Sequence, residues 1–245
     1  MGWVALLWGW IAAALMGVAK TGLPGFSIPS VALMTEAFAD DARLAIGAML
    51  PVLLVGDTLA VIWYRHHARW DRLWRLFPYV ALGMVPGWLL LRWLPEGNDL
   101  RPILGVLILG LVALEVCRRR FDWQDVPHQW WFVAAMGLLA GFCTIVAHAA
   151  FPVTAVYLLS QGMAKREFMG TATWFYLIVN FTKVPFYAQA GMLTRQTLLF
   201  DLAIIPAALA GAILGIYVLV RIPQRLFDAL ALALSAVAAV RLLAA

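Results

Sequence analysis

Long apolar runs separated by short polar breaks occupy most of this 245-residue chain. Stretches such as 103–116 and 226–240 are almost entirely apolar, which is typical of helices that face lipid. They do not alternate between apolar and polar residues, as the strands of a membrane barrel would. The pattern therefore predicts an all-α polytopic membrane protein.

The two halves of the chain share this pattern. A shift of 123 positions aligns them without a gap, and apolar runs and breaks then coincide. Aligned pairs are Thr21 with Thr144, Pro29 with Pro152, Arg43 with Arg166, Gly47 with Gly170, Asp57 with Asn180, and Tyr64 with Tyr187. Such self-similarity predicts a duplication. The expected domains are a first repeat (1–120), a basic cytoplasmic linker (121–128, directly after Arg118–Arg120) and a second repeat (129–245).

Each repeat divides into five apolar pieces. They are expected at 3–20, 26–38, 43–64, 74–94 and 100–117, and at 129–147, 150–161, 167–187, 197–220 and 223–243. The pieces 26–38 and 150–161 are too short to cross a hydrocarbon core of about 30 Å. Both follow polar or Gly/Pro-containing breaks, at 20–25 and 144–152. We therefore predict two broken, re-entrant helical hairpins.

The basic residues define an orientation. If each hairpin returns to its own side, the connections at 65–75, 117–128, 161–167 and 221–225 share one face. That face carries eleven Lys and Arg residues, and the opposite face carries five. The positive-inside rule places the richer face in the cytoplasm. Because five pieces is an odd number, the second repeat enters from the opposite side. The repeats are thus expected to be inverted, with both termini outside.

A helix that begins inside the membrane exposes unpaired amides and its positive dipole end, and both attract an anion. Two such helix starts, near 26–30 and 150–154, are expected to meet around a pseudo-two-fold axis. Nearby ammonium, imidazole, hydroxyl, amide and backbone groups complete the candidate site. The substrate-binding candidates are Lys20, Thr21, Gly22, Gly25, Ser27, Ser30, Thr144, His148, Thr154, Thr171, Asn180 and Lys183, with the Thr173 hydroxyl beside them.

Structural roles compete with these assignments. Lys183 either contacts the substrate or extends toward the interface, and His148 either binds or packs. Asp57 is either the structural partner of a lysine or a proton-coupling carboxyl. The hydroxyls also suit helix packing. Glu115 and Asp201 lie near helix ends and are expected to be solvated.

The segment 141–187 carries a motif that reads VYLLSQGMAKREFMGT, followed by W-F and then by V-N-x-x-K-x-P-x-Y. It resembles the second repeat of the sulfite exporter TauE/SafE family of membrane permeases, and 17–35 and 47–64 resemble the first repeat more loosely. The resemblance implies a multi-pass permease of the bacterial cytoplasmic (inner) membrane that moves sulfite, sulfonates or other small organic anions. Family members often have glycines at each break, whereas this chain has Ala-His-Ala-Ala-Phe at 147–151.

Together these features predict a secondary transporter of a small anion that works by alternating access around a mid-membrane site, with proton coupling as an option. An anion channel with the same site is the alternative. HExxH, CxxC and Ser-His-Asp patterns are absent, so an enzyme is not expected. No cofactor, metal or nucleic acid is expected. The expected partners are the anion and the lipid bilayer, and a homodimer is left open.

Overall fold

The computed structural model describes residues 2–21, 26–38, 41–94, 100–120, 129–161 and 163–217, together with Ala233, Ala236, Val237, Val240 and Leu243. Within these residues the structure is helical and contains no strand. The helices are α1 (Trp3–Thr21), α2 (Ser27–Ala37), α3 (Ala42–Tyr64), η2 (Arg65–His67), α4 (Trp70–Trp93), α5 (Leu100–Arg120), α6 (Trp130–Ala147), α7 (Phe151–Ser160), α8 (Lys165–Gln189) and α9 (Arg195–Tyr217).

These bounds agree closely with the apolar pieces expected from the sequence. The two short pieces form α2, with 11 residues, and α7, with 10 residues. The largest differences are at α4, which begins four residues earlier than expected, and at α5, which ends three residues later. The expected piece at 223–243 and the linker at 121–128 lie outside the described residues, apart from the isolated positions named above.

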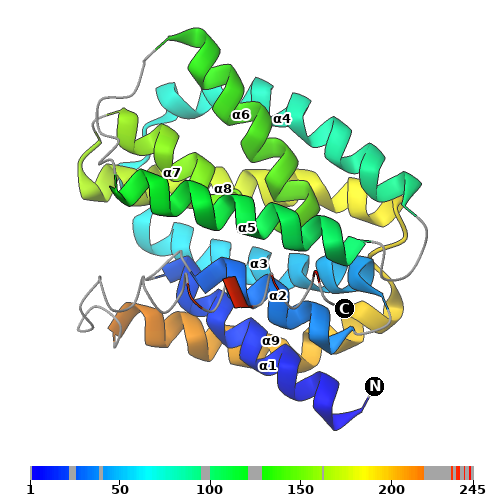
Figure 1. The fold of residues 1–245 in the computed structure, drawn as a ribbon. Coiled ribbons are helices and arrows are strands. Elements are labelled where there is room, and N and C mark those ends of the chain that lie inside the picture. The colour runs from blue at the N-terminus through cyan, green and yellow to red at the C-terminus, as the bar shows by residue number, and fades with distance from the viewer. Residues whose placement is uncertain are drawn as a thin grey trace.

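The helices are arranged in layers around α3 and α8, which lie side by side near the centre of Figure 1. On one side of this pair α1 packs along α9, and on the other α4 packs along α6. Glycine allows both outer pairs to approach closely. A Cβ atom at Gly17 would lie 2.0 Å from the carbonyl oxygen of Ala208, and one at Gly83 would lie 2.1 Å from that of Leu138. Small residues at such contacts are typical of helices that associate in a membrane.

Five of the described helical segments are long and apolar enough to cross a membrane: Trp3–Thr21, Ala42–His67, Trp70–Trp93, Trp130–Ala147 and Arg195–Ile216. Large apolar side chains are also exposed on the outside of the bundle. Leu82 is 61% exposed, Val106 63% and Leu202 69%. A surface of this kind is suited to lipid rather than to water. The chain is thus an all-α, multi-pass membrane protein.

Candidate functional site

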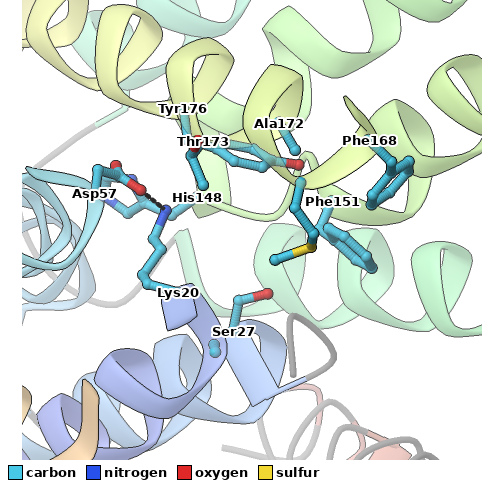
Figure 2. A pocket seen from close by; sticks show the side chains of 11 residues that line it. Lys20, Ser27, Asp57, His148, Phe151, Phe168, Ala172, Thr173 and Tyr176 are labelled. Carbon is cyan, nitrogen blue, oxygen red and sulfur yellow. Dashed lines mark ion pairs between the residues drawn. The ribbon is translucent and has the colours of Figure 1, made fainter. Parts of the chain in front are cut away.

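The two breaks in the helices converge on one cavity. Lys20 near the end of α1 and Ser27 at the start of α2 line it from the first half. His148 after α6 and Phe151 at the start of α7 line it from the second half (Figure 2). Its remaining lining residues are Ala19, Asp57, Phe168, Met169, Ala172, Thr173 and Tyr176. The cavity volume is about 40 Å³, several times the ~10–15 Å³ that one water requires. It suits a compact ion or a few waters.

An ion pair forms the polar end of this cavity. The Lys20 Nζ atom lies 2.7 Å from Asp57 Oδ1, with the Lys20 side chain 10% exposed and the Asp57 side chain 1% exposed. The amide of Asn180 donates a hydrogen bond to the other carboxylate oxygen, Oδ2, at 2.5 Å. Lys20 Nζ also lies 4.6 Å from the centre of the Tyr176 ring, in cation–π geometry. Asp57 is therefore satisfied on both oxygens, and the Lys20 side chain lines the cavity.

Local sequence makes room for this pair. Gly56 precedes Asp57 on α3, and a Cβ atom there would lie 2.9 Å from Lys20 Cγ. The missing side chain lets the lysine stem cross α3 and reach the carboxylate. On α8, Tyr176 precedes Asn180 by one turn, so both side chains project from the same face. The Tyr176 hydroxyl contacts the Thr154 hydroxyl, which connects this face to α7.

A second ammonium group lies close to the cavity but is fully buried. Lys183 Nζ donates to the Thr144 carbonyl oxygen at 3.1 Å and to Thr144 Oγ1 at 3.2 Å, and it lies 2.7 Å from His148 Nδ1. Its side chain is 0% exposed. Three partners match the three donors of an ammonium group. Lys183 therefore binds the carbonyl end of α6, where the helix dipole favours a cation.

His148 ends α6 in a left-handed conformation with φ 50°. The Ala149 amide bonds to the Cys143 carbonyl six residues back, which is the Schellman type of helix ending that usually uses glycine. Because Lys183 donates to Nδ1, the ring proton lies on Nε2, and Nε2 donates to the Ile46 carbonyl at 2.9 Å. The imidazole is thereby fixed between α8 and α3, with one edge toward the cavity.

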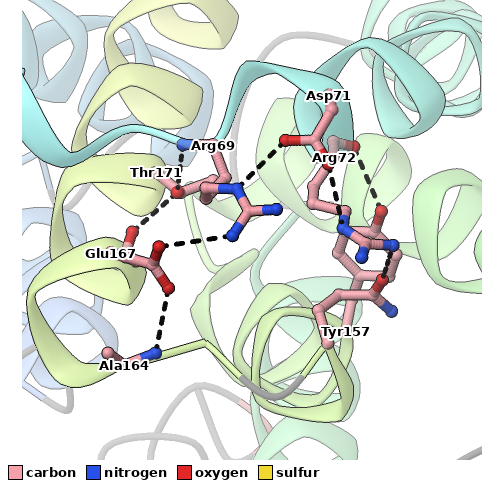
Figure 3. A network of polar contacts seen from close by, with 8 residues as sticks. Arg69, Asp71, Arg72, Tyr157, Ala164, Glu167 and Thr171 are labelled. Carbon is pink, nitrogen blue, oxygen red and sulfur yellow. Dashed lines mark hydrogen bonds and ion pairs between the residues drawn. The ribbon is translucent and has the colours of Figure 1, made fainter.

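A network of polar contacts surrounds the connection between η2 and α4 (Figure 3). We call it the loop network; it comprises Arg69, Asp71, Arg72, Tyr157, Gln161, Glu167 and Thr171. Arg69 forms ion pairs with Asp71 and Glu167, each at 3.3 Å, and its amide donates to Thr171 Oγ1 at 2.9 Å. These contacts hold the first turns of α8, which also carry Phe168 and Met169 of the cavity wall.

The other half of the loop network anchors α7. Arg72 donates to the side chain of Gln161 at 2.8 Å, and its carbonyl accepts a bond from the Tyr157 hydroxyl at 3.1 Å. The far end of α7 is thus tied to the start of α4, while its first residue, Phe151, lies at the cavity. Among the described residues, no group of three or more His, Cys, Asp or Glu is placed to hold a metal ion.

The structure sorts the residues predicted for the site into four groups. Lys20, Ser27, Asp57, His148 and Thr173 line the cavity. Thr144, Thr154, Asn180 and Lys183 contact lining residues. Thr21, Ser30 and Thr171 lie elsewhere, with their hydroxyls bonded to backbone groups of Ala212, Ala12, and Glu167 and Arg69. Gly22 and Gly25 lie outside the described residues.

The sequence analysis missed the aromatic and apolar wall formed by Phe151, Phe168, Met169, Ala172 and Tyr176. A signal was available, because 168, 172, 176 and 180 recur at a spacing of four and mark one face of α8. The expectation that Asp201 is solvated is wrong. Its residue is 1% exposed, because α9 packs along α1 and against α3 at this level of the bundle. Glu115 lies on α5, and its side chain is outside the described set.

A bundle of apolar helices around a small cavity that Lys20 lines is an arrangement that suits a transmembrane transport protein. The family model described as sulfite exporter TauE/SafE matches residues 5–242, nearly the whole chain, so the chain belongs to the TauE/SafE family of membrane permeases. No curated protein and no solved structure matches the chain.

Proposed function

We propose that this protein is a secondary transporter that moves a small anion, such as sulfite, a sulfonate or a related organic anion, across the bacterial cytoplasmic membrane. The carrying observation is the pair of lysines near the two helix breaks. Lys20 lines the cavity beside Asp57, and Lys183 lies next to it, bonded to Thr144 and to the His148 ring. Lys20 is therefore the basic group that an anion in the cavity would meet.

An anion in the cavity would lie beside Lys20, whose side chain lines the cavity and is 10% exposed. The Ser27 and Thr173 side chains and the start of α7 add hydrogen-bonding groups at the same place. The aromatic and apolar wall lowers the local dielectric constant, which strengthens each of these electrostatic contacts.

Two inverted repeats, 1–120 and 129–245, account for this arrangement. The 123-residue shift pairs Asp57 with Asn180, and these two side chains contact each other. Residues related by a two-fold axis meet only when they lie close to that axis. The same shift relates α1 to α6 and α9 to α4, and the structure packs α1 on α9 and α6 on α4. α1–α2 and α6–α7 then correspond to the two re-entrant hairpins.

Alternating access also fits the position of the cavity. Phe168 and Met169 lie in the first turns of α8, beside the loop network and at the arginine-rich end that we place in the cytoplasm. Toward the other end of α8, Lys183 is fully buried and the Tyr187 hydroxyl bonds to the Ile145 carbonyl. Closure at this end favours a transporter in an inward-facing state over an open channel.

A thermal-shift screen of the purified protein tests the anion site. The probes are sulfite, sulfate, thiosulfate, a two-carbon sulfonate and acetate. A ligand present at 100 times its dissociation constant stabilises the fold by about 2.7 kcal/mol, or roughly 5–10 °C for a domain of this size.

The screen is repeated with Ser27→Ala, which changes a cavity residue without touching the ion pair, and with Arg75→Met, a control at an exposed position outside the cavity. The proposal expects at least one anion to stabilise the wild type and Arg75→Met equally and Ser27→Ala less. Absence of a shift with every anion, or an equal shift in all three proteins, would contradict it.

A further inference from the structure

Asp201 is a buried carboxyl group that the anion site does not use. It lies on α9, six residues after Arg195, which is about 9 Å along the helix axis. The residue is 1% exposed, and neither carboxylate oxygen has a hydrogen-bond partner in the described structure. No ion pair to it occurs among the described residues either. The group therefore differs from Asp57, whose two oxygens are both bonded.

The nearest hydroxyl group along α9 does not supply the missing hydrogen bond to Asp201. Thr197 lies one turn earlier and is also fully buried, but its hydroxyl donates to the Thr194 carbonyl at 2.9 Å and accepts from the Thr194 amide at 2.9 Å. Its bonding capacity serves the first turn of α9. Asp201 receives no donor from its own helix.

The described elements that pack against α9 supply no counter-ion. Helices α1 and α3 pack against α9, and Phe38, directly after α2, makes a ring contact with Phe200 on α9. The ionisable side chains on these elements are Lys20 on α1, Glu36 on α2, and Arg43, Asp57 and Tyr64 on α3, with Arg195 and Tyr217 on α9 itself, the Tyr217 side chain lying outside the described set. Lys20 and Asp57 pair with each other, and Arg43 donates to the Leu94 and Ala190 carbonyls at 3.1 and 3.0 Å. None of these groups bonds to Asp201.

An ionised carboxylate in such a place would lose its hydration and gain nothing in return, at a cost of several kcal/mol. The neutral acid is the cheaper form, so Asp201 holds a proton in this conformation. A leucine or asparagine would fill the same space without leaving an unsatisfied acid. The carboxyl group thus lowers stability here, which is expected of a group whose use lies in another conformation.

We propose that Asp201 is the proton-carrying site of the transport cycle: it is protonated in the state described here and releases its proton when α9 moves against α1 and water reaches the carboxyl group. This role of Asp201 rests on the proposed function, and it gives the two buried carboxyl groups different tasks. Asp57 pairs with Lys20 and holds it in place, whereas Asp201 exchanges the proton. Charge is conserved, because one proton leaves the acid as H⁺ to water and one returns from water on the way back.

Infrared spectroscopy of the purified protein at neutral pH, without any anion, tests whether Asp201 is protonated. The carbonyl band of a protonated carboxylic acid is expected in the wild type, lost in Asp201→Asn and retained in Asp57→Asn. Asparagine has nearly the same shape, so Asp201→Asn is expected to melt no lower than the wild type. Loss of carboxylate bands in Asp201→Asn, with the acid band unchanged, would overturn the proposal.

Transport assays in proteoliposomes test whether Asp201 couples transport to protons, with sulfite, ethanesulfonate and acetate as the probes. The wild type and Asp71→Asn, an exposed control, are expected to respond to an imposed pH gradient. Asp201→Asn is expected to exchange the anion across the membrane and to lose that response. A response equal to that of the wild type would refute the coupling role. If the wild type carries none of the probes, the proposed function fails, and the infrared result still stands for or against a protonated Asp201.

Discussion

Removal of the Lys20 ammonium is the sharpest test of how the cavity is held together. In Lys20→Met the long stem of the side chain remains, but Asp57 loses the partner 2.7 Å away and keeps only the amide of Asn180. Breaking one partner of a buried pair typically costs about 3–5 kcal/mol, because it leaves a buried charge uncompensated. The exposed fraction of Lys20 lets some water reach the site, so we expect about 3 kcal/mol.

Thermal unfolding in detergent measures this cost. For a chain of this size, 1 kcal/mol corresponds to about 2–4 °C, so Lys20→Met is expected to melt roughly 6–12 °C below the wild type. The double variant Lys20→Met/Asp57→Asn removes both charges and retains a side chain that pairs with Asn180. It is expected to recover most of the lost stability while failing to bind anions.

Two controls make the result interpretable. Arg75→Met removes an exposed cation and is expected to change the melting temperature by no more than about 1–2 °C, since surface charges contribute little. Asp57→Asn alone leaves the ammonium unpaired and completes the double-mutant cycle. The reasoning fails if Lys20→Met melts with the wild type, or if the double variant melts as low as Lys20→Met.

Three further outcomes follow from neighbouring contacts. Gly56→Ala places a methyl group where Lys20 crosses α3, so anion-induced thermal stabilisation should fall, whereas Gly110→Ala at an open position should leave it unchanged. Lys183→Met should lower stability by about 3 kcal/mol or more in thermal melts, because it leaves Thr144 and His148 without their donor. Glu167→Gln should lower the free energy of unfolding by less than about 1 kcal/mol, because its ion pair with Arg69 is partly exposed to solvent. A larger loss of stability in thermal melts would contradict this expectation.

The sequence determined the local features of this protein. Continuous apolar runs fixed the helices, because lipid leaves no other way to satisfy the backbone. Breaks at 20–25 and 144–152 marked where helices end, and short runs after them marked α2 and α7. The same reading selected Lys20, Asp57, His148 and Lys183, because ionisable groups in apolar runs are rare and costly. The inverted repeat and the hairpins remain predictions that the geometry supports.

Only the tertiary structure decided which of these groups meet. Periodicity along one helix gives no information about the helix it faces, so the Lys20–Asp57 pair and the Asp57–Asn180 contact appeared only on packing. The hydroxyls of Thr21, Ser30 and Thr171 proved to bond to backbone groups of neighbouring segments, which no local pattern distinguishes from a binding role. Asp201 is the clearest case. Its position near a helix end suggested solvent, whereas the packing of α1 and α3 against α9 buries it. Burial depends on what packs against a residue rather than on its place in the chain.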